Sequence, residues 1–295
     1  MLIRGEIGPV DCESDAHSRD FVDPTFQTEF ANVPFGHSQL IVIDFLRVDV
    51  HDLPNTVLGE IEGGVVLLSH TVFYRFGAYT DEDGRFEVSG TTRELSNIDA
   101  EIRIYHDCND HGLPCQREWV IRVPDKYLTE GEHATAFMDV GELNLEVELE
   151  DESRKMFLPT LVAVATVVWT ANTFSIPEPH SGIQSYHVKG RLLCGSEPAH
   201  DVLVKLVDDD FGPDPDDSLE ISRTNQSGHF ELKGSTTAHL KVYHNCDDSL
   251  PCERRWKFEL PNHYITSGKK PKKVLDIGTW NLEARLPDES HDCIH

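Results

Sequence analysis

The stretches IRIYHDCNDHGLPC (residues 102–115) and LKVYHNCDDSLPC (residues 240–252) are two versions of one motif. The likeness extends upstream, where TDEDGRFEVSG (80–90) matches TNQSGHFELKG (224–234). A repeat of this length predicts two tandem domains and not a solenoid of short units. Seven residues after the motif recur at one offset of 137: Pro124, Tyr127, Gly131, Asp139, Gly141, Asn144 and Leu145 correspond to Pro261, Tyr264, Gly268, Asp276, Gly278, Asn281 and Leu282.

The second copy has the pattern of an all-β domain. Its strand candidates are short, alternating, and rich in β-branched or aromatic residues. Turn-forming residues separate them, and the pattern tolerates one short helical turn near 261–266 or 217–222. Seven or eight short strands at this spacing predict a β-sandwich. The expected strands are 186–194, 202–208, 229–233, 240–246, 255–260, 273–278 and 280–286.

Seven cysteines are present, and four of them lie in the second copy. Four cysteines in a domain of about 110 residues indicate an oxidising compartment. They allow three connectivities, which the sequence leaves open; proximity in a hairpin favours Cys246–Cys252 together with Cys194–Cys293. In the first copy the matching bond is Cys108–Cys115, and Cys12 has no partner in the repeat.

Residues 154–175, RKMFLPTLVAVATVVWTANTFS, have the three parts of a secretory signal. Two basic residues precede Met156, an apolar run extends to Trp169, and small and polar residues follow. The alternatives are a transmembrane anchor over 157–174, for which the apolar run is short, and a buried core element. A signal that begins at a methionine suggests two secreted proteins joined in one reading frame, with Met156 as the start of the second.

The first copy looks incomplete beside the second. Its segment IEGGVVLLSHTVFYRF (61–76) has no counterpart of VKGRLLC (188–194), and it ends at EDESR where the second copy continues PDESHDCIH. The chain before it is acidic and polar, which predicts mostly disorder with one strand at LIVIDFLRV (40–48). The expected organisation is a poorly structured region (1–60), an incomplete domain (61–153), an apolar helical segment of signal-peptide or transmembrane type (154–175) and a complete domain (176–295).

The chain resembles the nematode transthyretin-like family at several sequence elements in both copies. The matching elements include KGRLLCG (189–195), VKLVDDD (204–210), YHNC (243–246) and PCERRWKFELP (251–261). The resemblance covers nearly all of 186–295, and about 78–154 in the first copy. It implies an all-β, transthyretin-like eight-stranded β-sandwich that is secreted, has no enzyme activity and serves in extracellular binding.

Enzyme chemistry leaves no signature in the sequence. Nucleophile-elbow, P-loop and zincin motifs are absent. The 5-hydroxyisourate hydrolases look like transthyretin, but this chain lacks their C-terminal Tyr-Arg-Gly-Ser. A zinc site of His244, Cys246 and Cys252 is the alternative to bonded thiols, and His106 is the counterpart of His244 in the first copy. Because an oxidising compartment favours the disulfide, we expect no metal. Since the motifs are absent, we also expect no catalytic residue and no cofactor.

Two charged segments are candidates for binding. The acidic run between Asp208 and Glu220 offers carboxylates for calcium but does not follow the EF-hand spacing, so we interpret it as a solvated loop. A basic cluster stands out in a chain whose formal net charge is −26. It is the candidate binding surface, for anionic lipid head groups or for an acidic partner. Its members are Lys269, Lys270, Lys272 and Lys273.

The strongly acidic balance disfavours nucleic acid as a partner, because phosphates require basic patches. We predict a secreted, extracellular, non-enzymatic module that binds a partner protein, a lipid or a small apolar ligand. One alternative is a single-pass membrane protein with 157–174 as the span and a domain on each side. Another is a hydrolase by analogy of fold.

Overall fold

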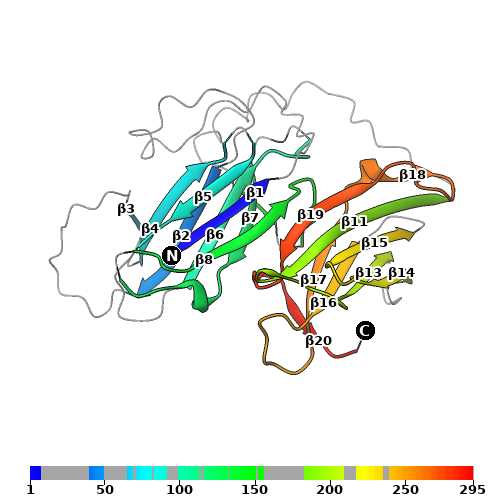
Figure 1. The fold of residues 1–295 in the computed structure, drawn as a ribbon. Helices are drawn as coiled ribbons and strands as arrows, with labels where there is room; N and C mark the ends of the chain where they lie inside the picture. The colour runs from blue at the N-terminus through cyan, green and yellow to red at the C-terminus, as the bar shows by residue number, and fades with distance from the viewer. Residues whose placement is uncertain are drawn as a thin grey trace, which may run out of the picture.

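The structure, a computed structural model, is almost entirely β, as the sequence predicts. Within the described residues, helical structure is limited to the 3-10 turns η3 (Asp125–Tyr127) and η5 (Asn262–Tyr264). The chain folds into two sandwiches that lie beside each other (Figure 1). The structure describes residues 1–7, 40–49, 65–68, 71–81, 83–91, 99–111, 113, 116–131, 133–150, 152–155, 183–208, 217–234 and 239–294.

The second domain packs one sheet, β15-β11-β19, against another, β14-β13-β16-β17-β20. Alternation defines the faces: in β15, Phe230 and Leu232 are buried, while His229, Glu231 and Lys233 are exposed. The strands are β11 (Gln184–Cys194), β12 (Glu197–Pro198), β13 (Leu203–Asp208), β14 (Asp217–Arg223), β15 (His229–Gly234), β16 (His239–His244), β17 (Glu253–Glu259), β18 (Thr266–Ser267), β19 (Leu275–Asn281) and β20 (Ser290–Asp292).

The first domain follows the same plan, with one sheet of β5, β1 and β8 and a second in the order β10-β7-β6-β2-β4-β3. The expected strand at 40–48 is confirmed as β2. The strands are β1 (Leu2–Ile7), β2 (Leu40–Asp49), β3 (Val65–Leu68), β4 (Thr71–Tyr79), β5 (Arg85–Ser89), β6 (Asp99–His106), β7 (Gln116–Arg122), β8 (Phe137–Leu143), β9 (Glu148–Leu149) and β10 (Ser153–Lys155).

The expectation that the first copy lacks its first strand is wrong, because β1 supplies it. Strand β1 pairs antiparallel with β5 and parallel with β8, as β11 does with β15 and β19. Gly5 lies opposite Phe86 just as Gly190 lies opposite Phe230. Residues 1–60 therefore contain two strands of the first sandwich, β1 and β2, and are not uniformly without structure.

The structure refines two local expectations about the second copy. Of the two alternative places for one short helical turn, the stretch 261–266 contains η5, whereas residues 217–223 form strand β14. The two strands expected at 273–278 and 280–286 are one strand, β19, with a register shift beside Gly278. The φ of Gly278 is 82°, a left-handed value that glycine adopts readily, so the chain bulges there without ending the strand.

The segment predicted at 154–175 lies outside the described residues from residue 156 onward. Its signal-peptide, transmembrane and core interpretations therefore remain predictions. Among the described residues, no helix has the length and apolar character that crossing a membrane requires.

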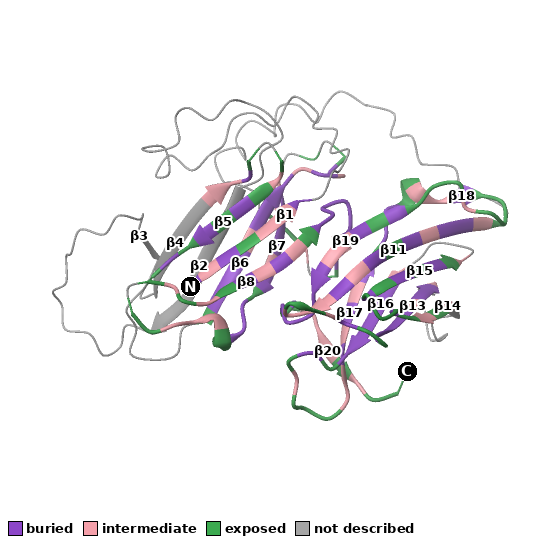
Figure 2. Ribbon diagram, in the orientation of Figure 1, coloured by how far each residue is buried: buried purple, intermediate pink, exposed green. Residues whose placement is uncertain are grey.

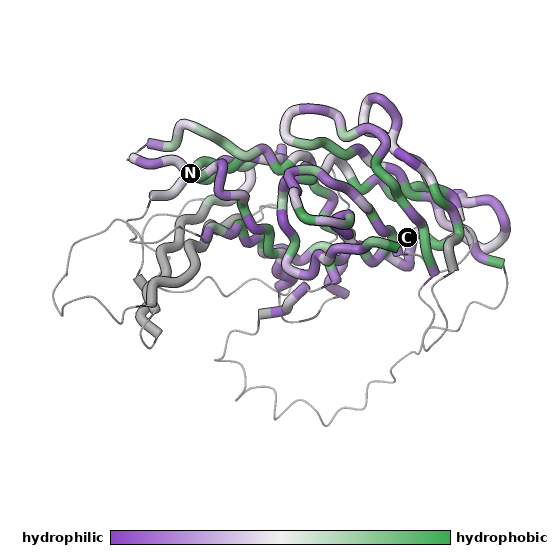
Figure 3. The backbone as a smooth tube through the Cα atoms, turned by 90° about the horizontal axis from the view of Figure 1, so that it is seen from below, coloured by the Kyte–Doolittle hydropathy of each residue, from purple (hydrophilic) through white to green (hydrophobic). Residues whose placement is uncertain are grey.

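The two domains share one sheet. Strand β8 pairs antiparallel with β19, so that the sheet β5-β1-β8-β19-β11-β15 runs through both sandwiches (Figure 1). Beside it, β9 of the first domain pairs with β17 of the second, and Arg122 forms a bridge with Arg285. Buried positions alternate with intermediate or exposed ones along much of the shared strands (Figure 2), and hydrophobic and hydrophilic residues alternate along much of the backbone (Figure 3).

Candidate functional site

The basic loop, defined as residues 269–273, connects β18 to β19 at the end of the second domain. Its four lysines are exposed, and no salt bridge joins them to the described acidic residues. The loop is held from within, since Lys273 Nζ donates to the His263 carbonyl oxygen at 2.5 Å and the Lys272 amide donates to Thr266 Oγ1 at 3.2 Å. The structure thus presents the predicted cluster as one exposed surface.

Two exposed apolar side chains flank the basic loop. Val274 follows Lys273 directly, with 42% of its surface exposed, and Ile183 is 54% exposed. Ile183 lies at the base of the loop, because its carbonyl oxygen accepts a hydrogen bond from the Gly268 amide at 2.6 Å. Cationic and apolar groups therefore occur together at this end of the domain.

A shallow groove lies on the outer face of the shared sheet, with a volume of about 520 Å³. Charged side chains line it, and most of them already have partners: Lys189 binds Asp276 at 2.9 Å, and Glu231 accepts from Lys233 at 2.6 Å. A lining of this kind does not suit a small apolar ligand, which requires a predominantly apolar pocket.

The cysteines pair differently from the expected pattern. The bonds are Cys194–Cys246, with Cα atoms 5.7 Å apart, and Cys252–Cys293, with Cα atoms 4.5 Å apart. The register explains both. Cys194 ends β11 and Cys246 follows β16, so their bond joins the two sheets. Strand β20 pairs with β17 with Asp292 opposite Glu253, which places Cys293 beside Cys252. The predicted pairs Cys246–Cys252 and Cys194–Cys293 are wrong, because cross-strand register, not closeness in sequence, sets the distance between sulfur atoms.

The first-copy bond falls partly outside the described residues. Cys108 is buried and disulfide-bonded, whereas Cys115 and Cys12 both lie outside the described part of the chain. The predicted Cys108–Cys115 bond therefore stays a prediction. The acidic run considered for calcium is also outside the described residues between 209 and 216.

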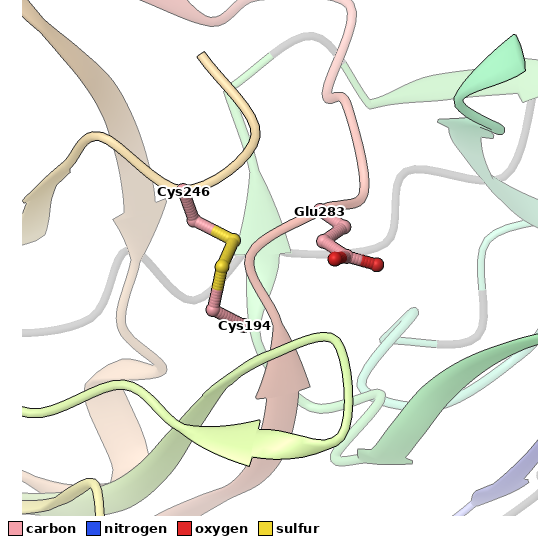
Figure 4. Close-up of side chains that lie close together, drawn as sticks. All are labelled: Cys194, Cys246 and Glu283. Carbon is pink, nitrogen blue, oxygen red and sulfur yellow. A yellow bond between two sulfur atoms is a disulfide. The ribbon is translucent and has the colours of Figure 1, made fainter. Parts of the chain in front are cut away.

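The zinc set considered from the sequence does not come together, because Cys246 and Cys252 belong to separate disulfides. A different group, Cys194, Cys246 and Glu283, lies close enough to hold an ion (Figure 4). Its two sulfur atoms are bonded to each other, so neither is the thiolate that a metal requires. The Glu283 carboxylate instead accepts a hydrogen bond from the Tyr127 hydroxyl and forms a 2.7 Å ion pair with Lys126.

The recurrent histidines are structural. His244 and His106 are buried, and each ring meets a tryptophan edge-on, with centroids 5.2 Å from Trp256 and 5.4 Å from Trp119. His244 Nδ1 accepts from the Cys246 amide at 3.3 Å. Burial lowers the pKa of His244 to about 3, with the Arg254 charge acting in the same direction, and burial likewise lowers that of His106. Neutral rings at ordinary pH fit a packing role.

The comparisons with known proteins agree with this geometry. A family model described as the transthyretin-like family matches residues 74–124 and 189–261. Transthyretin-like protein 33 of Caenorhabditis elegans is 44% identical over 119 residues, which cover 38% of this chain and 83% of the relative. The chain belongs to the transthyretin-like family. Transthyretin-like proteins 46 and 5 of the same organism are 49% and 40% identical over 119 residues, covering 66% and 86% of their lengths and 38% of this chain.

Sequence reasoning missed one feature of both transthyretin-like domains, a buried arginine that we call the arginine clasp. In the second domain Arg254 donates to the carbonyl oxygens of Cys246, Leu282 and Ala284 at 2.7–2.9 Å, and to Glu289 at 2.5 and 3.0 Å. Trp256 Nε1 donates to the same Glu289 carboxylate at 3.0 Å. The guanidinium thus ties the chain after β19 to β17.

The first domain repeats the clasp atom for atom. Arg117 donates to the carbonyl oxygens of Cys108, Leu145 and Val147 at 2.6–3.0 Å and to Glu152, while Trp119 also bonds Glu152. The signal was in the sequence: RxW after the second cysteine of the motif, and Asp-Glu-Ser after the last long strand, occur in both copies.

Proposed function

We propose that this protein is a secreted, non-enzymatic binding module of the extracellular space, which binds an anionic partner through the basic loop. The observation that carries the proposal is the exposure of four neighbouring lysines, free of salt bridges to the described acids, on a chain of net charge −26. An uncompensated cationic surface on an acidic protein attracts anionic groups while the remainder repels them.

Three further observations support the proposal. The two disulfides of the second domain are typical of an oxidising compartment outside the cytosol. The two histidines whose pKa values burial lowers strongly, His106 and His244, are packed in the sandwich interiors and not gathered in a cleft, which suits a binding protein better than an enzyme. Ile183 and Val274 add apolar contact beside the lysines.

The test is binding of the full chain to phosphatidylcholine vesicles with and without anionic phospholipid, which serve as a probe of an anionic surface. The variant Lys269→Glu/Lys270→Glu is expected to weaken binding by about 30-fold or more, since each lysine near an anionic surface contributes about 1 kcal/mol. The matched control is Lys189→Glu/Lys233→Glu, which changes the net charge equally at two lysines outside the loop.

Equal losses in the two variants would show that only net charge matters and would contradict the loop as the binding surface. Absence of binding to anionic vesicles and to an acidic polypeptide such as polyglutamate would contradict an anionic partner altogether.

A further inference from the structure

The junction between the domains has the form of a two-fold symmetric interface. Strands β8 and β19 pair antiparallel around Glu142 and Thr279, which lie directly opposite each other. These two residues correspond in the repeat, since they share the offset of 137. The flanking pairs, Gly278–Leu143 and Trp280–Gly141, exchange with each other under the same correspondence. Each domain thus offers the same edge to the other, as in an isologous dimer.

Side-chain contacts repeat across this axis. The Tyr127 hydroxyl donates to Glu283 of the second domain, and the Tyr264 hydroxyl donates to Glu146 of the first at 2.6 Å. The side-chain amide of Asn281 donates to the Asp139 carbonyl oxygen, and the side-chain amide of Asn144 donates to the Asp276 carbonyl oxygen, both at 2.8 Å. All four are contacts between domains, and each has its counterpart.

Two glycines allow the close approach. Gly141 and Gly278 have φ values of 97° and 82°. A Cβ on Gly141 would collide with the Thr279 carbonyl oxygen, and one on Gly278 would collide with that of Glu142. Both obstructing atoms belong to the opposite domain, so these positions are shaped by the junction.

The two halves differ where they meet, and the differences are complementary. Trp280, which is 1% exposed, reaches Trp119 of the first domain with ring centroids 5.5 Å apart, whereas the equivalent position holds the smaller Leu143. Lys126 binds Asp247 and Glu283 at 3.0 and 2.7 Å, whereas the equivalent of Lys126 is His263. Pairing two copies of one domain would place two tryptophans or two leucines at the axis and would change these charge pairs.

We propose that each domain is a specific partner of the other, and that they associate as a heterodimer would, without help from the connecting chain. The shared edge supplies backbone hydrogen bonds, Trp280 supplies the buried anchor, and Lys126 favours the unlike pair.

The experiment uses the full chain with a protease site inserted within residues 157–182, which lie outside the described residues. After cleavage under native conditions, the two fragments are expected to co-elute in size-exclusion chromatography with light scattering at the mass of the uncut chain. Elution at half that mass without denaturant would overturn the proposal.

A cysteine pair locates the junction independently of affinity. In the cleaved chain, Glu142→Cys/Thr279→Cys is expected to join the fragments on a non-reducing denaturing gel, because directly opposite Cβ atoms lie about 4.5–5.5 Å apart. The cleaved wild-type chain is the control, since both described disulfides lie within the second domain. Failure to cross-link would contradict the pairing of β8 with β19.

Two substitutions of opposite charge at Thr279 then test the contact with Glu142 at the centre of the junction. Thr279→Glu places two carboxylates opposite each other and is expected to speed separation of the cleaved fragments by up to about fivefold, while Thr279→Lys slows it. Equal rates for the two variants in low salt would contradict contact at this position.

Discussion

His244 illustrates at the scale of one residue how burial sets a chemical property. Its ring is 3% exposed and lies against Trp256, so protonation would place a charge in the core close to Arg254. The folded-state pKa of about 3 lies below the ordinary value of 6.5. The unfolded chain therefore binds the proton more tightly, and stability that is complete above pH 6.5 falls as the pH falls toward 3.

We expect the free energy of unfolding to decrease by about 1.4 kcal/mol per pH unit for this group between pH 6 and 4. In His244→Gln this part of the slope is lost, whereas in the exposed control His229→Gln it stays. Urea titrations at several pH values measure the difference. An unchanged slope in His244→Gln would show that the ring is protonated in the folded protein.

At the scale of elements, the arginine clasp joins parts of the chain that the sheets do not. Arg254 belongs to β17. Its carbonyl acceptors lie in the segments that follow β16 and β19, outside these strands. A buried guanidinium is tolerable here because carbonyl oxygens and one carboxylate satisfy all its donor atoms. Loss of the arginine would leave those carbonyl oxygens without this donor, and the Glu289 carboxylate would keep the Trp256 hydrogen bond but lose its compensating charge.

Arg254→Met is accordingly expected to destabilise the protein by about 3–5 kcal/mol, the usual effect of breaking a buried ion pair. The neighbour Arg255 is half-buried on the opposite face of the same strand, and the described residues give it no ion pair, so Arg255→Met is expected to change stability by less than about 1 kcal/mol. Chemical denaturation followed by tryptophan fluorescence compares the two. Similar losses would refute the clasp as a source of stability.

The sequence predicted most elements of the second domain, because alternation and turn residues are local signals. What it missed depends on pairing between distant residues. Strand β1 is six residues long and belongs to β5 and β8, more than 70 residues away in the chain, so no local pattern assigns it. The disulfide partners follow from the register of β17 with β20 in the same way.

The candidate binding surface was likewise predictable from local sequence, whereas the junction between the domains was not. The basic loop was visible as a run of lysines, and the structure adds its exposure and the flanking Ile183 and Val274. The junction was hidden, because Gly141 and Gly278 look like ordinary turn residues until β8 and β19 are seen side by side.

At the scale of the molecule, the shared sheet leaves β5 and β15 as its ends. Both are protected by charge, with Arg85 and Glu87 on one and Glu231 and Lys233 on the other. Such edges resist pairing with further strands. The edges of β8 and β19 cover each other, which fits a unit of two domains and not an open chain of them.

The central claim is that both copies are complete sandwiches, and it depends on β1 occupying the place that β11 has in the second domain. Hydrogen exchange followed by mass spectrometry tests this directly. The account predicts that amides in residues 2–7, such as Ile7, whose amide donates to the Gly84 carbonyl oxygen at 2.8 Å, exchange as slowly as those of 186–192. Complete exchange of residues 2–7 within seconds, while 186–192 stay protected, would contradict it.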